Sequence, residues 1–379
     1  MTAYHGGMLV PGFGRRTYLG YRKLIQCCTS LNDFDAARAI YYAMTEAAQR
    51  EALTCYLMHK AAVRSGDEEL AAECLENVAL ANPAREYLYA CVVDAQQTGE
   101  KRCAIAALKK LVLCHELKAP GPVHLPALLR CTIRLLWTCL DDQVEGDSNQ
   151  SVTIQDLCDM FEGGRCSTPR SERCPLTILT AVKVIGRAPS DENGNSLFDI
   201  TELEWFCRSA YNLGMKHAST STWSLRHIVQ ILEVCISIRG AFPQDLDADT
   251  SADLSLKAIF CHFMIASALV ALARAEDKCE QRGSDYRRMR EHIAAFDNEF
   301  QSLLKSLDER VSEDLVGKLA ILLVFDFEGA LAGEQWPELA ECVRRAEICK
   351  DAGVYQAMGD CLLRSNMPPE CKSLSGFPL

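Results

Sequence analysis

A short pattern of turn and helix residues repeats three times near the start of this chain, and its period constrains the fold more than any other feature. The turn residues Asn32, Gly66 and Gly99 lie 34 and then 33 residues apart. After each turn come a small, a large and an apolar residue at spacings i, i+4 and i+7, which form one stripe of an α-helix. The three stripes are Ala37, Tyr41 and Met44; Ala71, Leu75 and Val78; and Ala104, Leu108 and Leu111. A small residue lets two helices approach closely, so the pattern predicts paired helices.

A period near 34 residues with a Gly-Asp type turn is typical of tetratricopeptide repeats. We therefore predict an all-α fold, a tetratricopeptide-like α-solenoid in which antiparallel helix pairs stack into a right-handed superhelix. Three clear pairs are expected over residues 17–117, followed by degenerate helical repeats over 118–365. Residues 1–16 are expected to be a disordered or atypical start, and 366–379 a flexible tail.

The second half of the chain also has a helical pattern. A helix over 198–218 is expected to be capped by Asp199 or Thr201, with acidic residues in its first turn. Further helices are predicted over 224–239, 251–281, 286–307 and 311–331. The repeat pattern returns over 333–349, where Leu339, Val343 and Ala346 have the same spacing as the early stripes.

Composition narrows the class of protein. Hydrophobic residues make up 49% of the 379 residues but aromatic residues only 7%, which suits close helix packing. A net charge of −11 argues against a nucleic-acid-binding surface along the whole chain. The 20 cysteines include no C-x-x-C pair, and many of them, such as Cys27, Cys74, Cys91 and Cys131, fall on apolar stripes as small hydrophobes. With no expected secretion signal or membrane span, the chain is expected in a reducing compartment, cytosol or nucleus.

Catalytic and cofactor motifs are missing from the sequence. It contains no phosphate-binding loop, no H-E-x-x-H and no G-x-S-x-G, so no enzymatic activity, no cofactor and no small-molecule substrate are expected. One frame resembles a calcium loop, with oxygen donors at Asp191, Asn193, Asn195, Asp199 and Glu202. Its sixth place is Ser196 instead of glycine, so the alternative is an ordinary loop that leads into a capped helix.

An aromatic block at 204–213 is the best candidate for holding a partner. Trp205, Phe206, Tyr211 and Asn212 are residue types that anchor protein interfaces. The alternative is ordinary helix core, and the two roles can coexist. Trp336, just after a turn, is a second candidate contact, with side-chain packing as its alternative.

Several segments together resemble the meiosis-specific Zip-four (Spo-twenty-two) family. The segments are HKAAVRSGDEELAAECLENVA, YLYACVVDAQQTGEKRCAIAALKKLV, HLPALLRCTIRLL, LEWFCRSAYNLG and WPELAECV. The resemblance runs from about residue 20 to about residue 365, and its most specific part is the block that contains Trp205, Phe206, Tyr211, Asn212 and Leu213. Family members are tetratricopeptide scaffolds that are usually far longer, so this chain is expected to be a C-terminal portion.

The resemblance implies a nuclear scaffold on meiotic chromosomes that promotes crossover formation and synaptonemal complex assembly. The implied partners are other crossover factors, including an XPF-type scaffold, and axis or central-element proteins, with no direct contact to nucleic acid or membrane. The alternative is a generic intracellular tetratricopeptide adaptor, a chaperone or ubiquitin-ligase cofactor. Such an adaptor would line one groove with cations, yet Lys109, Lys110 and Lys118 share no obvious stripe. The first helix, 18–28, is expected to leave apolar surface bare through Leu19, Leu24 and Ile25.

Overall fold

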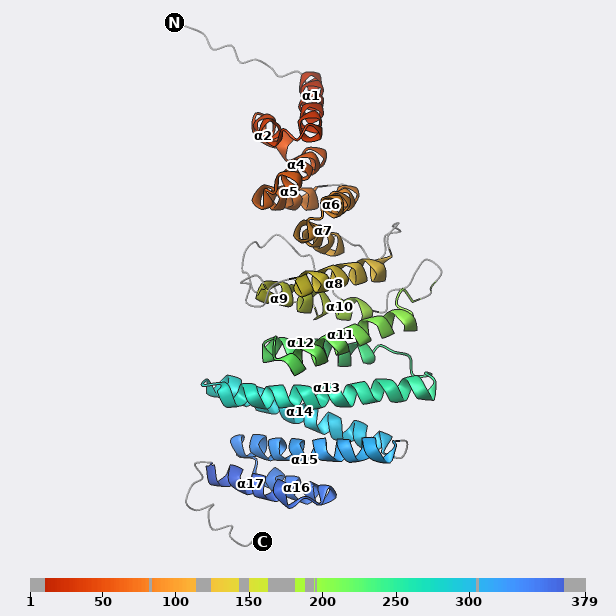
Figure 1. Ribbon diagram of the computed structural model, residues 1–379, viewed down its shortest axis with the longest axis vertical. Helices are drawn as coiled ribbons and strands as arrows, with labels where there is room; N and C mark the ends of the chain where they lie inside the picture. The colour runs from red at the N-terminus through yellow and green to blue at the C-terminus, as the bar shows by residue number, and fades with distance from the viewer. Residues whose placement is uncertain are drawn as a thin grey trace. The chain divides into compact units, whose positions relative to one another are not determined.

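The computed structural model describes residues 11–81, 84–113, 124–142, 150–162, 181–187, 194, 196–304 and 307–364, with the backbone alone at 11–18, 84–85 and 162. The chain divides into two compact units, residues 1–197 (unit 1) and 198–379 (unit 2). The described residues are almost entirely helical and contain no β-strand. The predicted all-α fold is therefore confirmed, and within each unit helices stack on their neighbours as in an α-solenoid (Figure 1).

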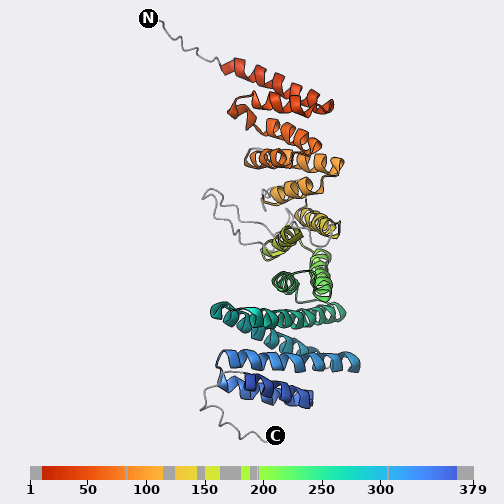
Figure 2. The ribbon, with the colours of Figure 1, turned by 60° about the vertical axis from the view of Figure 1, so that its left-hand side comes forward.

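Unit 1 is a stack of helix pairs, and tight turns join the helices of its first three pairs. Its helices are α1 (Pro11–Ser30), α2 (Phe34–Tyr42), α3 (Glu46–Gln49), α4 (Ala52–Ser65), α5 (Glu68–Leu80), α6 (Ala84–Thr98), α7 (Lys101–Leu113), α8 (Leu125–Asp142), α9 (Gln150–Glu162) and α10 (Ala181–Ile185). The pairs α1/α2, α4/α5 and α6/α7 follow one another in the stack, and α8/α9 extends it (Figure 2). The degenerate repeats keep stacking beyond residue 117, so the compact unit ends only at 197.

The three aligned turn residues share one backbone conformation. Asn32, Gly66 and Gly99 have φ of 60°, 74° and 79°, the left-handed region that glycine and asparagine tolerate best. In each turn the following N–H donates to a carbonyl five residues earlier, which closes the preceding helix. Asp33 and Asp67 then cap the next helix through their side chains.

A fourth turn of this kind lies in unit 2. Glu334 has φ of 55°, and the N–H of Gln335 donates to the carbonyl of Ala330 over 2.9 Å. The left-handed residue is therefore Glu334 and not Gly333, whose φ is −91°.

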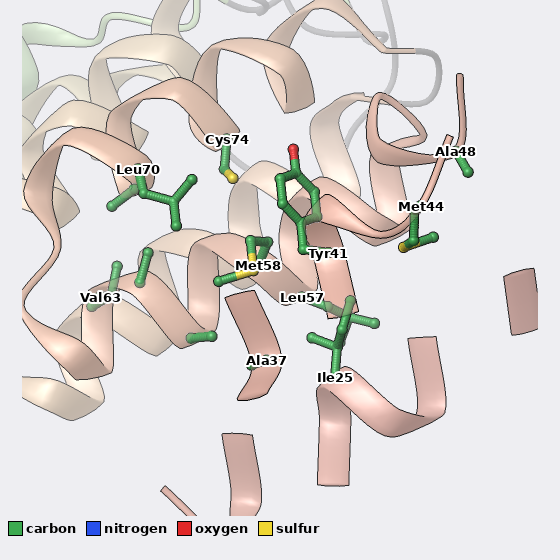
Figure 3. Close-up of a cluster of buried hydrophobic side chains, with 13 residues drawn as sticks. Ile25, Ala37, Tyr41, Met44, Ala48, Leu57, Met58, Val63, Leu70 and Cys74 are labelled. Atoms are coloured by element: carbon green, nitrogen blue, oxygen red, sulfur yellow. The ribbon is translucent and has the colours of Figure 1, made fainter. Parts of the chain in front are cut away.

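The small–large–apolar stripes form the core of unit 1. All nine residues of the three predicted stripes are buried. The first cluster joins Ile25 of α1, Tyr41 of α2 and Met58 of α4 with Cys74 of α5 (Figure 3). Ile25, expected to be bare, is therefore a core residue because α2 and α4 cover it, whereas Leu19 and Leu24 are exposed. The late repeat differs by one position, because Leu339, Cys342 and Ala346 are buried while Val343 is only half-buried. Positions i+3 and i+4 both lie near one helix stripe, so spacing alone does not choose between them.

Unit 2 contains longer helices in the same alternating order. They are α11 (Ile200–Thr220), α12 (Leu225–Arg239), α13 (Ala248–Ala275), α14 (Cys279–Leu303), α15 (Glu309–Ala332), α16 (Trp336–Ala346), a short 3₁₀ turn (Glu347–Cys349) and α17 (Ala352–Arg364). Helices α11, α13, α15 and α17 contact one another in succession. Ion pairs link α12 to α14 through Glu233 and Arg288, and α14 to α16 through Asp297 and Arg345. Of the two predicted caps, Asp199 is the one that caps α11, its side chain accepting from the N–H of Glu202, while Thr201 lies inside the helix.

Two boundary predictions were wrong. The break expected after residue 281 lies at Glu276–Lys278, and α14 runs through Gly283, where an added Cβ would meet nothing within 4 Å. Glycine signals a break only where the backbone needs its freedom, and here the backbone is helical. Residues 11–16 belong to α1, which Pro11 opens because a first-turn residue needs no N–H donor. Residues 1–10 and 366–379 lie outside the described part.

Helix α13 bears on the expectation that no segment spans a membrane. By length and composition alone it is apolar enough to cross one, with a window of mean hydropathy 2.0. Of that window, 56% is buried inside the protein, and α12 and α14 pack against the helix. A central core helix has the same composition, and this burial accounts for the apolar character of α13.

Candidate partner-binding surface

The predicted contact residues on α11 separate into core and surface. Phe206 is fully buried, so its ring belongs to the core of unit 2. The prediction that Phe206 contacts a partner was therefore wrong. Trp205 is half-buried, with its ring 5.0 Å from that of Phe206 in an edge-to-face arrangement, and Asn212 is exposed. Trp205, Arg208 and Asn212 are spaced i, i+3 and i+7, so they lie on one outer face of α11.

Tyr211 lies on a different side of α11, near Cys235 of α12 and Cys261 of α13. It is half-buried, and burial raises the pKa of its hydroxyl to about 12. Nearby Cys261 and Cys235 act in the same direction. Tyr211 therefore packs against α12 and α13 more than it offers its ring to a partner.

A small cleft separates α11 from the first turns of α13. Its volume is about 220 Å³, and it is lined by Glu204, Cys207, Arg208, Asp249, Thr250, Asp253, Leu254 and Lys257. Arg208 belongs both to this cleft and to the outer face of α11. The cleft and the exposed face that carries Trp205 are thus neighbouring parts of one surface.

Cys207, which lines this cleft, forms a thiol pair with Cys235 of α12. The Sγ atoms of Cys207 and Cys235 lie 3.6 Å apart. This hydrogen bond, together with burial, raises the pKa of Cys207, which keeps its thiol protonated. Cys207 is therefore a core thiol, not an activated nucleophile.

A second group of half-exposed apolar side chains joins α13 to α15. We call it the apolar stripe: Phe260, Phe263 and Met264 on α13, with Ile321 and Phe325 on α15. The Lys318 Nζ lies 5.6 Å from the ring centres of both Phe260 and Phe263. Near the other end, the Arg274 guanidinium lies 5.4 Å from the Phe325 ring centre.

The cations around these surfaces are paired with carboxylates. Lys318 binds Asp314 at 2.6 Å, and Arg274 donates to Glu328 at 2.9 Å. In the lining of the cleft, Lys257 binds Asp253, and Arg208 lies 3.8 Å from Glu204.

The remaining predicted sites lie apart from this surface or cannot be placed. Trp336 is the first residue of α16 and is 37% exposed. Asp191, Asn193 and Asn195 of the calcium frame lie outside the described residues, while Asp199 serves as a helix cap. Among the described residues, no group of three or more His, Cys, Asp or Glu side chains is arranged to hold a metal ion.

The cysteine prediction was right in part. Cys74 and Cys91 are buried, and burial raises the pKa of Cys91 to about 12. Cys27 and Cys131, predicted to be core residues, are exposed.

Sequence reasoning missed the apolar stripe. Phe260, Phe263 and Met264 lie in a run of α13 that is apolar on every side, so the sequence does not distinguish its buried face from its exposed face. The helices that pack against α13 determine which face remains exposed.

Comparison with known proteins adds no family. A scan against protein-family models finds no match for this chain, and a search of curated proteins finds none either.

Proposed function

We propose that the chain is a non-enzymatic scaffold that binds partner proteins, with the outer face of α11 as one contact surface. The observation that carries the proposal is the row of Trp205, Arg208 and Asn212 beside the α11–α13 cleft. Trp and Arg are the residues most enriched at the centres of protein interfaces, and a neighbouring cleft can receive a partner side chain. Stacked helix pairs offer extended surfaces of this kind.

We further propose a setting in meiosis, which rests on the resemblance to the Zip-four (Spo-twenty-two) family and on a tetratricopeptide type of repeat. The partners would be crossover and synapsis proteins, including an XPF-type scaffold and axis or central-element proteins, and the location would be the nucleus. The left-handed turns and buried stripes of unit 1 support a tetratricopeptide-like repeat.

The alternative, a generic chaperone or ubiquitin-ligase adaptor, has less support. A cation-lined groove for acidic tails was its expected mark. Lys109 pairs with Asp156 and Lys110 with Glu76, so each already has a carboxylate partner within the chain, while Lys118 lies outside the described residues.

An affinity pull-down from meiotic cells tests the proposal. The full chain is compared with a Trp205→Ala, Asn212→Ala variant and with Trp137→Ala, a matched control at a half-buried tryptophan of unit 1. We expect crossover or synaptonemal-complex factors with the wild type and the control, and loss of them with the α11 variant. Capture of no such factor by the wild type contradicts the meiotic setting, and capture of chaperones alone favours the adaptor. Equal capture by all three chains moves the contact surface away from α11.

A further inference from the structure

Two buried thiols of unit 2 lie close enough to be joined by a covalent bond. The Sγ atoms of Cys207 on α11 and Cys235 on α12 are 3.6 Å apart, and each residue is 2% exposed. The Cys207 Sγ also lies 3.9 Å from the backbone carbonyl oxygen of Cys235, so the two helices approach closely at this point. Because a disulfide bond is about 2.05 Å long, the two sulfur atoms would have to close by about 1.5 Å, which is within the range of side-chain rotation.

The packing of α11 on α12 holds the two thiols together. Two turns beyond Cys207, a Cβ added at Gly214 would lie 2.3 Å from the Cδ2 atom of Leu232, which precedes Cys235 by one turn. Leu232 is fully buried, so the spacing of the helices is fixed on this side as well. Two groups that a rigid structure keeps in contact react with each other far more readily than the same groups free in solution.

A small oxidant can reach one of the two thiols. Cys207 lines the α11–α13 cleft of about 220 Å³, whereas Cys235 is not among the described residues that line it. Hydrogen peroxide is only slightly larger than a water molecule, which takes up about 30 Å³ in the liquid, so it fits this space. The hydrogen bond to Cys235 and burial raise the pKa of Cys207, and the Lys257 ammonium only partly opposes them. Cys207 therefore reacts slowly at neutral pH and faster as pH rises.

We propose that Cys207 and Cys235 form a disulfide when the chain meets a two-electron oxidant such as hydrogen peroxide, and that this bond locks α11 to α12. The Cys207 thiolate first attacks one peroxide oxygen. An S–O bond forms, the O–O bond breaks, and the leaving hydroxide takes up a proton to become water. The inference does not depend on the proposed scaffold role.

The second step joins the two helices. The Cys235 sulfur attacks the Cys207 sulfenic acid, so the S–S bond forms, the S–O bond breaks and a second water leaves. In total, two thiols lose two electrons and two protons, and one peroxide is reduced to two waters. A dithiol such as dithiothreitol reverses the reaction by thiol–disulfide exchange.

The bond should stabilise unit 2, and a third thiol offers a competing product. The two cysteines are 28 residues apart in sequence, and a cross-link of this kind restricts the unfolded chain. Oxidation should therefore raise the melting temperature of unit 2. Cys261 of α13 is also hydrogen-bonded to Cys235, so a Cys235–Cys261 disulfide is the alternative that the experiment has to distinguish.

Peptide mapping of the full wild-type chain reads the bond directly. Trypsin places the three thiols in separate peptides, 188–208, 227–239 and 258–274. The folded chain is treated with hydrogen peroxide, remaining thiols are blocked with N-ethylmaleimide, and the digest is analysed by mass spectrometry without reduction. We expect 188–208 linked to 227–239, and dithiothreitol should remove the link. Its rate of formation should rise about tenfold per pH unit between about pH 7 and 8.5, because the thiolate is the reacting form.

Thermal unfolding gives an independent readout. Oxidised wild type should melt at a higher temperature than reduced wild type, and Cys207→Ala and Cys235→Ala should both lose this difference. The controls are Cys261→Ala, which keeps the pair, and Cys74→Ala, which removes a buried thiol of unit 1. Both controls should retain the difference, and circular dichroism confirms that each variant is folded.

Three results of the mapping would overturn the proposal. They are Cys207 recovered only as sulfinic or sulfonic acid, 227–239 linked to 258–274 instead, and linkage that appears only when urea unfolds the chain. A linked wild type that melts at the same temperature as the reduced chain would show that the bond does not lock the helices. The mapping uses the wild type, so its outcome holds even where a variant does not fold.

Discussion

At the residue scale, buried polar groups tie the helices of unit 2 together in defined pairs. His262 of α13 and His292 of α14 bring their Nδ1 atoms to 2.9 Å, so one ring donates and the other accepts. The second nitrogen of His292 lies 3.4 Å from Glu233 of α12, which Arg288 also binds. Burial would raise the pKa of Glu233, but hydrogen bonds from His292 and Arg288 outweigh it and lower that pKa.

The His262 side chain makes stability depend on pH. Burial, with help from neighbouring His292 and Arg239, lowers the pKa of His262 to about 3. The unfolded chain therefore takes up this proton first as pH falls below about 6.5, so the free energy of unfolding declines by up to about 1.4 kcal/mol per pH unit. Urea unfolding between about pH 6.5 and 5.5, above the range of ordinary carboxyl groups, measures this slope. We expect His262→Gln to flatten it, while the exposed His124→Gln leaves it unchanged; equal slopes in all three chains contradict this account.

Asp94 is the corresponding buried anchor in unit 1. It is 4% exposed and accepts from the Tyr56 hydroxyl and the Lys60 ammonium, each at 2.7 Å. Removing its carboxylate leaves both donors without this acceptor, so Asp94→Ala should lower the free energy of unfolding by about 3 kcal/mol. The exposed Lys101–Asp142 pair is the control, because Asp142→Ala should cost less than about 1 kcal/mol. Similar losses in both variants, measured by urea unfolding, would refute the assignment.

At the element scale, the helix pairs depend on turns that place one residue in the left-handed region. Glycine occupies that place in two turns of unit 1, whereas the turn between α15 and α16 uses Glu334. A residue with a Cβ is strained there by about 1–2 kcal/mol. We expect Glu334→Gly to raise the melting temperature and Gly66→Ala to lower it. Since a Cβ at Gly66 would touch nothing within 4 Å, the loss would come from backbone strain alone. A rise with Gly66→Ala would exclude this explanation.

Gly214 allows α11 and α12 to pack closely, which is a different role for glycine from that in the turns. A Cβ at Gly214 of α11 would lie 2.3 Å from Leu232 Cδ2 and 2.7 Å from its Cγ. Leu232 is itself fully buried and has little room to move. Gly214 is therefore required by side-chain packing, in contrast to the open Gly317 and Gly283.

At the scale of the whole molecule, two compact units are expected to unfold separately. Helices in a stack contact mainly their neighbours, so a local defect destabilises its own unit first. We expect two transitions in a thermal scan of the full chain, with Asp94→Ala shifting one. Gly214→Ala, which overpacks unit 2 by about 1–3 kcal/mol, should shift the other. A single transition that moves as a whole in both variants would show that the units unfold together.

The amino-acid sequence by itself determined the local features of this protein. The period near 34 residues identified the left-handed turns, and the stripes that follow them are the buried core of unit 1. Both depend on backbone conformation and helix periodicity within a few residues, which are local properties. The cap at Asp199 was readable for the same reason.

The tertiary structure alone decided which side chains face outward. Phe206 and Trp205 are adjacent aromatic residues on one helix, yet only the first is fully buried. The apolar stripe was hidden because α13 is apolar all round, and only the positions of α12, α14 and α15 leave one side open. Exposure depends on which distant segments pack against a helix, and a residue's own neighbours in sequence do not specify that.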